Sequence, residues 1–242
     1  MRLVPRIKRK GFTMYLENCV DKLLSGTNFF INRRNTTDEF VRSKLDTDIS
    51  VEILKGKRKN LLLMNYKWRV LVIQGDRALL LSEDIIDRQP YHKEWISVTW
   101  ETSALRHYLN GEFYARFSSQ DQTRIIEVVN RNMNNQWSGT RGGNNTSDKV
   151  FLLSLEEVVK YFGDSGRLWH KSPEREYWID DIYNGNREAK FKKRSLAWWL
   201  RSPGEGFCEA VAVAHDGSIL MDGFIVDHSE GVRPALWLNL RL

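Results

Sequence analysis

Hydrophobic and polar positions are patterned most clearly near the C-terminus. Residues 210–214 and 219–226 are two apolar-rich runs separated by Asp216-Gly217-Ser218, a combination typical of a tight turn. The pattern predicts a β-hairpin. Two segments that contain proline bracket it, WWLRSPG at 198–204 and GVRPALW at 231–237. Because proline fixes its own φ and restricts the residue before it, each bracket predicts a fixed bend.

The same reading predicts a second hairpin upstream, with strands at 68–73 and 78–81 and a turn at 74–77. Alternation of apolar and polar residues predicts an exposed strand at 49–54, and an apolar run predicts a buried strand at 149–153.

Apolar residues at helical spacing predict four helices. The first covers residues 14–31, and the second begins near Trp100 behind a cap at Ser97 or Thr99. The third is predicted at 122–129, after an N-cap at Ser118 and Ser119. The fourth follows a capping box and ends at a glycine; the positions that define it are Ser154, Glu157 and Gly163. Residues on one face of the second helix are Leu105, Tyr108, Leu109 and Phe113.

Two polar stretches, 130–148 and 164–195, lack the apolar residues of a core and are predicted to be surface loops. Strands mixed with helices in this order predict an α+β fold.

Composition is that of a globular protein, with 41% hydrophobic and 28% charged residues. No apolar run approaches the roughly 18 residues of a membrane-spanning helix. The basic residues near the N-terminus are not followed by the apolar segment and cleavage site of a secretory signal. The sequence therefore predicts a cytoplasmic protein. Its two cysteines, Cys19 and Cys208, are far apart and are interpreted as free thiols.

Charge is unevenly distributed. Residues 1–60 contain 14 Lys or Arg and 7 Asp or Glu, whereas the remainder is close to neutral. We therefore divide the chain into a basic N-terminal segment, 1–60, and a domain, 61–242. Such a segment is either a solvated arm or a surface for nucleic acid, which is the second functional hypothesis.

Five separated motifs carry a resemblance to a known family. They are WRVL at 68–71, VTWETSALR with YLN at 98–110, DKVFLLS at 148–154, and the brackets WLRSPG and GVRPALWLNL. In this order they resemble an uncharacterised bacterial branch of the C-type-lectin-like fold, related to formylglycine-generating enzymes and to the variable proteins of diversity-generating retroelements. The resemblance covers about 67–240, and the first 60 residues lie outside it.

This resemblance implies an α+β domain with a small antiparallel sheet, two flanking helices and long irregular loops. In the related variable proteins the residues between the brackets are displayed and bind a ligand, usually a protein. Carried over by position, the ligand-binding residues here are Glu205, Phe207, Cys208, Glu209, Ala212, Ala214, His215, Leu220, Met221, Asp222, Phe224, Ile225, Asp227 and His228. Whether a retroelement diversifies them is a question for the neighbouring genes.

Residues of this chain suggest three kinds of chemistry. Oxidation of the formylglycine-generating type needs a copper-binding cysteine pair, and Cys208 has no second cysteine near it in sequence. A metal or acid–base site could use His215 and His228 with nearby aspartates, but the carboxylate of Asp216 is explained by turn chemistry. Calcium could use an oxygen-rich loop, although the usual lectin triplets are absent; its residues are Asn144, Asn145, Ser147 and Asp148.

The sequence therefore predicts no catalytic residue, metal or cofactor. It favours a non-enzymatic module, cytoplasmic or associated with a phage, that presents residues 205–228 to a protein or another macromolecule. The metal-dependent oxidase is the third hypothesis. Arg201 and Arg233, beside the prolines, are predicted to hold loop carbonyls. Trp137, Trp169 and Trp178 lie in polar stretches, where exposed aromatics often contact partners.

Overall fold

The computed structural model describes residues 50, 52–53, 56, 59–171 and 177–241. The predicted helix at 14–31 and most of the basic segment lie outside these residues. The described part is a mixed fold of helices and sheets with more strand than helix, which confirms the α+β class. In place of one small sheet, it contains a sheet of five strands and a sheet of six.

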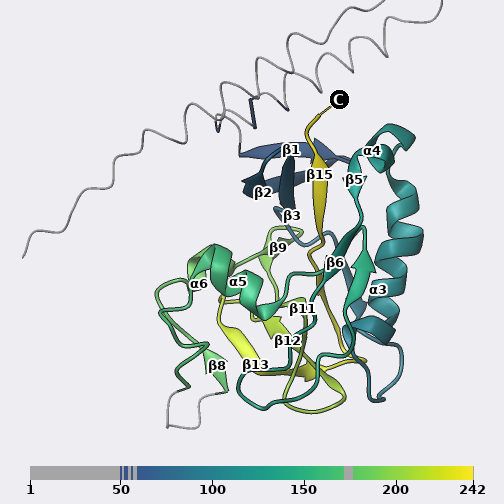
Figure 1. The fold of residues 1–242 in the computed structure, drawn as a ribbon. Helices are drawn as coiled ribbons and strands as arrows, with labels where there is room; N and C mark the ends of the chain where they lie inside the picture. Colours follow the sequence, from purple (N-terminus) through teal and green to yellow (C-terminus); the bar gives the residue numbers. More distant parts are fainter. Residues whose placement is uncertain (1–49, 51, 54–55, 57–58, 172–176, 242) are drawn as a thin grey trace, which may run out of the picture.

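The five-stranded sheet is antiparallel and lies at the end of the molecule that carries the C-terminus (Figure 1). Its strands, in spatial order, are β1 (Asn60–Leu63), β2 (Tyr66–Gln74), β3 (Arg77–Ser82), β15 (Ala235–Asn239) and β5 (Ile125–Ile126). The predicted hairpin is β2 and β3, joined at Gly75, whose φ is 58°. The C-terminal strand thus joins the first hairpin through β3, with Leu236 opposite Leu80.

The six-stranded sheet carries the bracketed hairpin. Its strands, in spatial order, are β4 (Asp87–Pro90), β14 (Ser229–Val232), β11 (Trp198–Pro203), β12 (Glu209–Val213), β13 (Ile219–Ile225) and β8 (Trp178–Ile179). The predicted hairpin is β12 and β13, and the two brackets form β11 and β14–β15. Strands β11 and β14 are parallel, with Trp198 beside Gly231, so the brackets lie side by side.

Helices flank the sheets, and two short ribbons occupy the polar stretches. The helices are η1 (Trp100–Thr102), α3 (Ala104–Tyr108), η2 (Leu109–Phe113), η3 (Tyr114–Arg116), α4 (Ser119–Arg124), α5 (Leu155–Phe162) and α6 (Asn184–Arg187). The ribbons are β6 (Val128–Asn130) with β7 (Thr146–Asp148) and β9 (Lys190–Phe191) with β10 (Arg194–Ser195). In Figure 1, α3 lies on one side of the molecule and α5 with α6 on the other.

Local signals placed two helices correctly. Thr99 begins the helical stretch, Ser103 caps α3 by accepting a hydrogen bond from the Arg106 N–H at 3.1 Å, and the predicted apolar face is buried except for Tyr108. The capping box before α5 is confirmed, since the Ser154 N–H donates to Glu157 Oε2 at 2.8 Å and the Glu157 N–H donates to Ser154 Oγ at 3.2 Å. Gly163, with a φ of 95°, ends that helix.

Four local predictions are wrong. The helix predicted at 122–129 ends at Arg124, because Ile125 pairs with Leu238 of β15. The β-branched residues that follow Ile125 favour strand and continue in β5 and β6. Residues 150–153 are buried and Lys149 is half-buried, but they form no named strand. Phe151 makes an isolated bridge to Ala235, and the Leu153 carbonyl accepts a hydrogen bond from the Arg201 N–H of β11 at 3.0 Å. At 49–54 the described residues 50, 52 and 53 are helical instead of extended. The stretches 130–148 and 164–195 contain β6 to β10 and α6 in part, and several of their residues are buried.

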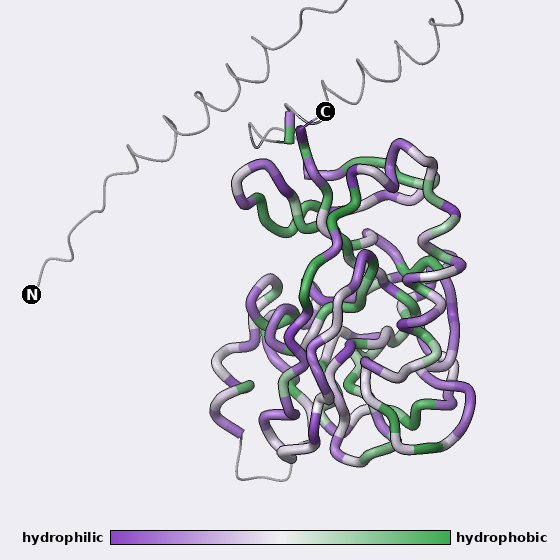
Figure 2. Tube along the Cα trace, turned by 45° about the vertical axis from the view of Figure 1, so that its right-hand side comes forward, coloured by the Kyte–Doolittle hydropathy of each residue, from purple (hydrophilic) through white to green (hydrophobic). Residues whose placement is uncertain are grey.

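The core is continuous from one sheet to the other. Their places in the motif segments predict five tryptophans as core anchors, and four of these, Trp68, Trp100, Trp198 and Trp199, are fully buried within the core. The fifth, Trp237, is only half-buried and packs against the core. Hydrophobic segments lie mainly in the interior, and hydrophilic loops make up much of the outline (Figure 2). Ile53 belongs to the same core, so packing against the domain begins before residue 60. Among the described residues, no helix combines the length and apolar character needed to cross a membrane.

Candidate functional site

The two brackets form a buried frame around the β12–β13 hairpin. All six residues of β11 are buried, and so are 231–236. Each tryptophan of β11 has a partner for its indole N–H: Trp198 donates to the Arg187 carbonyl at 3.1 Å and Trp199 to the Gln89 carbonyl at 3.0 Å. A satisfied, fully buried indole fixes the position of its strand. Strand β11, which pairs with β12, therefore gives the hairpin a rigid neighbour.

Two buried arginines complete this frame. Arg233 donates to the carbonyls of Ser82 at 2.9 Å and Glu83 at 3.1 Å, and its guanidinium lies 4.9 Å from the centre of the Trp198 ring. Burial lowers the pKa of Arg233 to about 9, so the group is still charged at neutral pH. Arg201 donates to the Leu152 carbonyl at 2.8 Å and pairs with Glu157. Both guanidiniums hold loop carbonyls, as predicted from their places beside proline.

The turn of the hairpin needs its own side chains for structure. Asp216 Oδ1 accepts hydrogen bonds from the Ser218 N–H at 3.0 Å and the Ser218 hydroxyl at 2.7 Å. Partial burial acts to raise the pKa of Asp216, but these bonds outweigh it and the net shift is downward. This carboxylate is therefore a turn residue, in agreement with the sequence interpretation.

Gly217 provides a direct test of this turn. Its φ is 84°, and a Cβ there would overlap the carbonyl oxygen of Asn184. We expect Gly217→Ala to lower the free energy of unfolding by about 2–3 kcal/mol, from backbone strain together with the clash. The matched control is Gly75→Ala, where φ is 58° and no atom lies within 4 Å, so only the backbone cost applies. Equal losses in chemical denaturation would show that the contact with Asn184 contributes nothing.

The structure corrects part of the predicted ligand-binding set. Ala212, Ala214 and Met221 are buried. Ala212 belongs to β12, an inner strand in which residues 210–213 are all covered, Ala214 directly follows that strand, and Met221 belongs to β13, between β12 and β8. These three residues cannot be displayed. Six others are exposed, namely Glu205, Phe207, His215, Ile225, Asp227 and His228. Five are half-buried, namely Cys208, Glu209, Leu220, Asp222 and Phe224.

The histidines do not come together. His215 lies at the start of the β12–β13 turn, and His228 follows the other end of β13. The seven residues of β13 separate them by about 20 Å at the usual rise of a strand. Within the described ranges, no group of three or more His, Cys, Asp or Glu side chains has a metal-binding arrangement. Cys208 is half-buried, and Cys19 lies outside the described residues.

The oxygen-rich loop proposed for calcium serves another purpose. Asp148 is buried, and its carboxylate accepts from Trp100 Nε1 at 3.0 Å, Arg106 Nε at 2.6 Å and Asn130 Nδ2 at 2.9 Å. The Thr146 hydroxyl donates to it at 2.7 Å. Because both oxygens already accept from protein donors, this carboxylate joins α3, β6 and β7 and is not presented to a cation.

Around Gly204 the hairpin is tied to the polar stretch 130–148. The side-chain amide of Asn135 donates to the carbonyls of Pro203 at 2.9 Å and Met221 at 2.8 Å, and Asn135 is buried. Glu205 and Asp222 lie beside this junction, joined by a backbone hydrogen bond of 2.8 Å. Burial, reinforced by the charges of Glu209 and Glu205, raises the pKa of Asp222. From its polar neighbours Asn135 was predicted to lie in a surface loop, so its buried role was not predicted.

Four large apolar side chains are exposed on the hairpin and on the segment before Val98. Phe207 is 74% exposed, Trp95 69%, Ile96 44% and Ile225 36%. Backbone hydrogen bonds hold their segments together: the Val98 N–H donates to the Phe207 carbonyl at 3.1 Å and the Val226 N–H to the Cys208 carbonyl at 2.9 Å. We name Trp95, Ile96, Phe207 and Ile225 the apolar rim.

Sequence reasoning found only half of this rim. Phe207 and Ile225 were predicted from their place between the brackets, whereas Trp95 and Ile96 lie in a loop more than a hundred residues earlier. The available signal was the pair of large apolar side chains after Lys93 and Glu94, which no helical or strand periodicity explains. Of the loop tryptophans, Trp169 and Trp178 are exposed, and Trp137 is half-buried with its indole donating to the Leu168 carbonyl at 3.1 Å.

Comparison with known proteins yields one match. No curated protein and no solved structure matches the chain. A family model described as a domain of unknown function, DUF6273, matches residues 75–240, which contain the whole six-stranded sheet, both brackets and the apolar rim. The chain thus belongs to the DUF6273 family.

Proposed function

We propose that this protein is a non-enzymatic binding module that contacts a protein partner through the apolar rim and the neighbouring residues of the β12–β13 hairpin. The observation that carries the proposal is the exposure of Trp95, Ile96, Phe207 and Ile225 on adjoining segments. Large exposed aromatic and aliphatic side chains that lie together are typical of protein interfaces.

The support beneath the rim favours the same function. The segments that carry the rim are attached to a frame of buried tryptophans and arginines. Because this frame is already rigid, the backbone of the rim loses little conformational entropy when a partner binds. Phe224 adds an edge-on contact to Trp199, with ring centres 6.2 Å apart, and thereby anchors the end of β13.

We propose further that the fold is a member of the C-type-lectin-like class, related to retroelement-diversified variable proteins. Two features support this: the C-terminal strand β15 lies in one sheet with the first hairpin, and the brackets are buried while much of the intervening sequence is exposed. In this proposal the displayed set excludes Ala212, Ala214 and Met221 and includes Trp95 and Ile96.

The test is an affinity purification from cells of the source organism with Trp95→Ser plus Phe207→Ser. We expect this variant to lose at least one protein that the wild type retains, because two large apolar contacts are worth several kcal/mol at an interface. A control carries Val129→Ser and Ile182→Ser, which remove two side chains 74% and 87% exposed at other places on the surface. If both variants retain the same proteins and the same melting temperature as the wild type, the rim is not the binding surface.

A further inference from the structure

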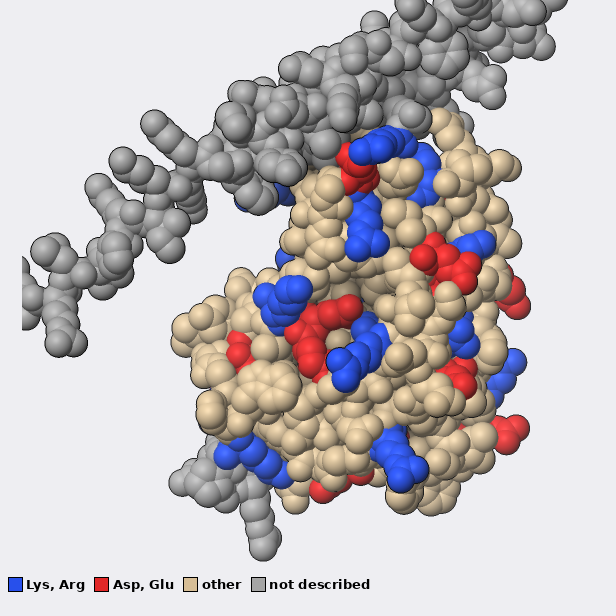
Figure 3. Space-filling model, viewed as in Figure 1, with Lys and Arg blue, Asp and Glu red and all other residues tan. Residues whose placement is uncertain are grey.

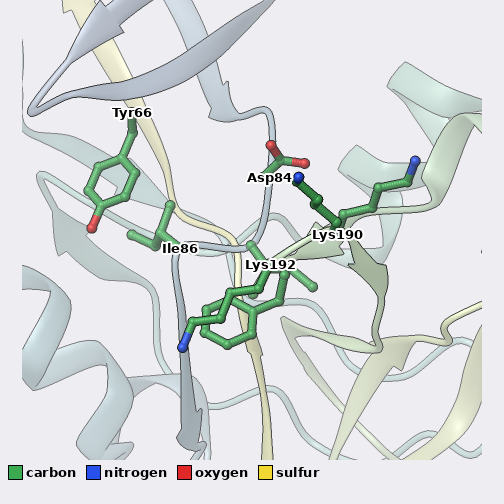
Figure 4. A pocket seen from close by; sticks show the side chains of 8 residues that line it. Tyr66, Asp84, Ile86, Lys190 and Lys192 are labelled. Atoms are coloured by element: carbon green, nitrogen blue, oxygen red, sulfur yellow. The ribbon is translucent and has the colours of Figure 1, made fainter.

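A groove lies where the start of β2, the connection between β3 and β4, and the β9–β10 hairpin meet. Its volume is about 520 Å³, within the range of sites for small ligands. The residues that line it are Tyr66, Asp84, Ile85, Ile86, Lys190, Phe191, Lys192 and Lys193. In Figure 4, the Lys190 and Lys192 side chains leave the β9–β10 hairpin in different directions, and Tyr66, at the start of β2, lies on the same side as Lys192.

The groove is built from fixed segments. The Ile85 N–H donates to the Lys190 carbonyl at 2.9 Å, and the Ile86 N–H donates to the Val232 carbonyl at 3.0 Å. These bonds join the floor of the groove both to the β9–β10 hairpin and to bracket strand β14. The lysine-bearing wall thus has a defined position relative to Tyr66.

Positive charge dominates the lining, with three lysines against one aspartate. Behind the floor lies Arg233, whose guanidinium is bound to the carbonyls of Ser82 and Glu83, next to Asp84 in the chain. Among the described residues, no carboxylate lies within ion-pair distance of Arg233, and its Nη1 atom has no hydrogen-bond partner. A buried cation of this kind adds to the attraction for an anion at the groove. On the face seen in Figure 3, acidic and basic residues lie side by side.

The turn of the β9–β10 hairpin is unfavourable for its residues. Lys192 has a φ of 49° and Lys193 a φ of 73°, the left-handed conformation that a two-residue hairpin turn requires. Asn-Gly meets that requirement at little cost, whereas two adjacent lysines bring both backbone strain and charge repulsion. Strain of this kind is commonly retained where it serves a binding site. The comparable turn at Met64 and Asn65 has an asparagine at its second position.

We infer that this groove binds a nucleotide unit, with its phosphate at the turn that carries Lys192 and Lys193 and its base against Tyr66 or Phe191. Lysine supplies point charges for phosphate, and half-buried aromatic rings provide stacking surfaces that accept any base. Two sources have this chemistry: a free nucleotide and a nucleotide within a single strand. The site is separate from the apolar rim and does not depend on the proposed protein partner.

The experiment measures the binding of a fluorescein-labelled oligothymidylate to the full chain by fluorescence anisotropy at several salt concentrations. We expect Lys192→Gln plus Lys193→Gln to weaken binding about tenfold and to reduce the slope of log affinity against log salt by about 1.4, for two lost phosphate contacts. The basic segment 1–60 is the same in every variant, so its contribution cancels. Arg141→Gln plus Lys160→Gln removes two exposed cations that do not line the groove and is expected to retain most of the affinity.

Two further arms identify the ligand and its source. Adenosine monophosphate is expected to displace the strand at lower concentration than inorganic phosphate, and Tyr66→Leu to reduce that difference. A strand bound more tightly than the mononucleotide indicates nucleic acid, and equal affinities indicate a free nucleotide. Equal competition by phosphate, equal losses in the two double variants, or no binding of either probe would overturn the inference. Lys192→Asn plus Lys193→Gly is expected to raise the melting temperature, because Asn-Gly suits the turn, and to lower the affinity. A loss of affinity in a more stable protein cannot be caused by unfolding.

Discussion

Replacing Asp148 with asparagine is expected to lower the free energy of unfolding by about 3–5 kcal/mol, which corresponds to a fall of roughly 10 °C in Tm for a chain of this size. The carboxylate is buried, pairs with Arg106 and accepts from the Trp100 indole, the Asn130 amide and the Thr146 hydroxyl. Asparagine has the same shape but replaces one acceptor oxygen with a donor. At least one of these buried donors would then lose its partner, and Arg106 would lose its counter-charge.

Thermal and urea unfolding followed by circular dichroism measure this effect. Glu112→Gln is the matched control, because it makes the same chemical change on an exposed helical residue. Its expected change is within about 0.5 kcal/mol. Equal stabilities of Asp148→Asn and wild type would contradict the role assigned to the carboxylate.

Truncating Arg233 to alanine is expected to cost about 3–5 kcal/mol as well. The change empties a fully buried volume beside Trp198 and leaves the Ser82 and Glu83 carbonyls without their donor. Arg233→Lys keeps the charge and the length but provides no planar fork, so it should recover only part of the loss.

Urea denaturation of the three proteins gives the comparison, with Arg141→Ala as the control at an exposed arginine. The order of stability is expected to be wild type, lysine variant, alanine variant. A lysine variant as stable as the wild type would show that charge alone, and not bidentate geometry, holds the loop that begins at Ser82.

Local chemistry was sufficient to predict several elements. The capping box of Ser154 and Glu157, the glycine that ends α5 and the tight turn at Gly217 each depend on residues within four positions of one another. The alternation of β2 and β3 and the strand–turn–strand of β12 and β13 are likewise local. These predictions are confirmed because no distant contact competes with them.

Other elements depend on partners far along the chain. The helix predicted at 122–129 ends early because Ile125 pairs with Leu238 of β15, more than a hundred residues later in the chain. Asn135 and Asp148 looked like loop residues by composition, yet each is buried by contacts that the fold supplies. Its neighbours in sequence do not determine whether a polar residue is exposed to solvent or is buried with several hydrogen bonds.

The candidate surface shows the same division. The sequence by itself determined that two proline-containing brackets enclose a hairpin, and that Arg201 and Arg233 hold carbonyls, because turn geometry and guanidinium chemistry are local properties. Only the tertiary structure decided which hairpin residues are displayed. Ala212 is buried because β12 is an inner strand in which residues 210–213 are all covered, whereas the segment with Trp95 and Ile96 joins the hairpin through the hydrogen bond from the Val98 N–H to the Phe207 carbonyl. Burial depends on which segments pack together, and that packing is a property of the whole chain.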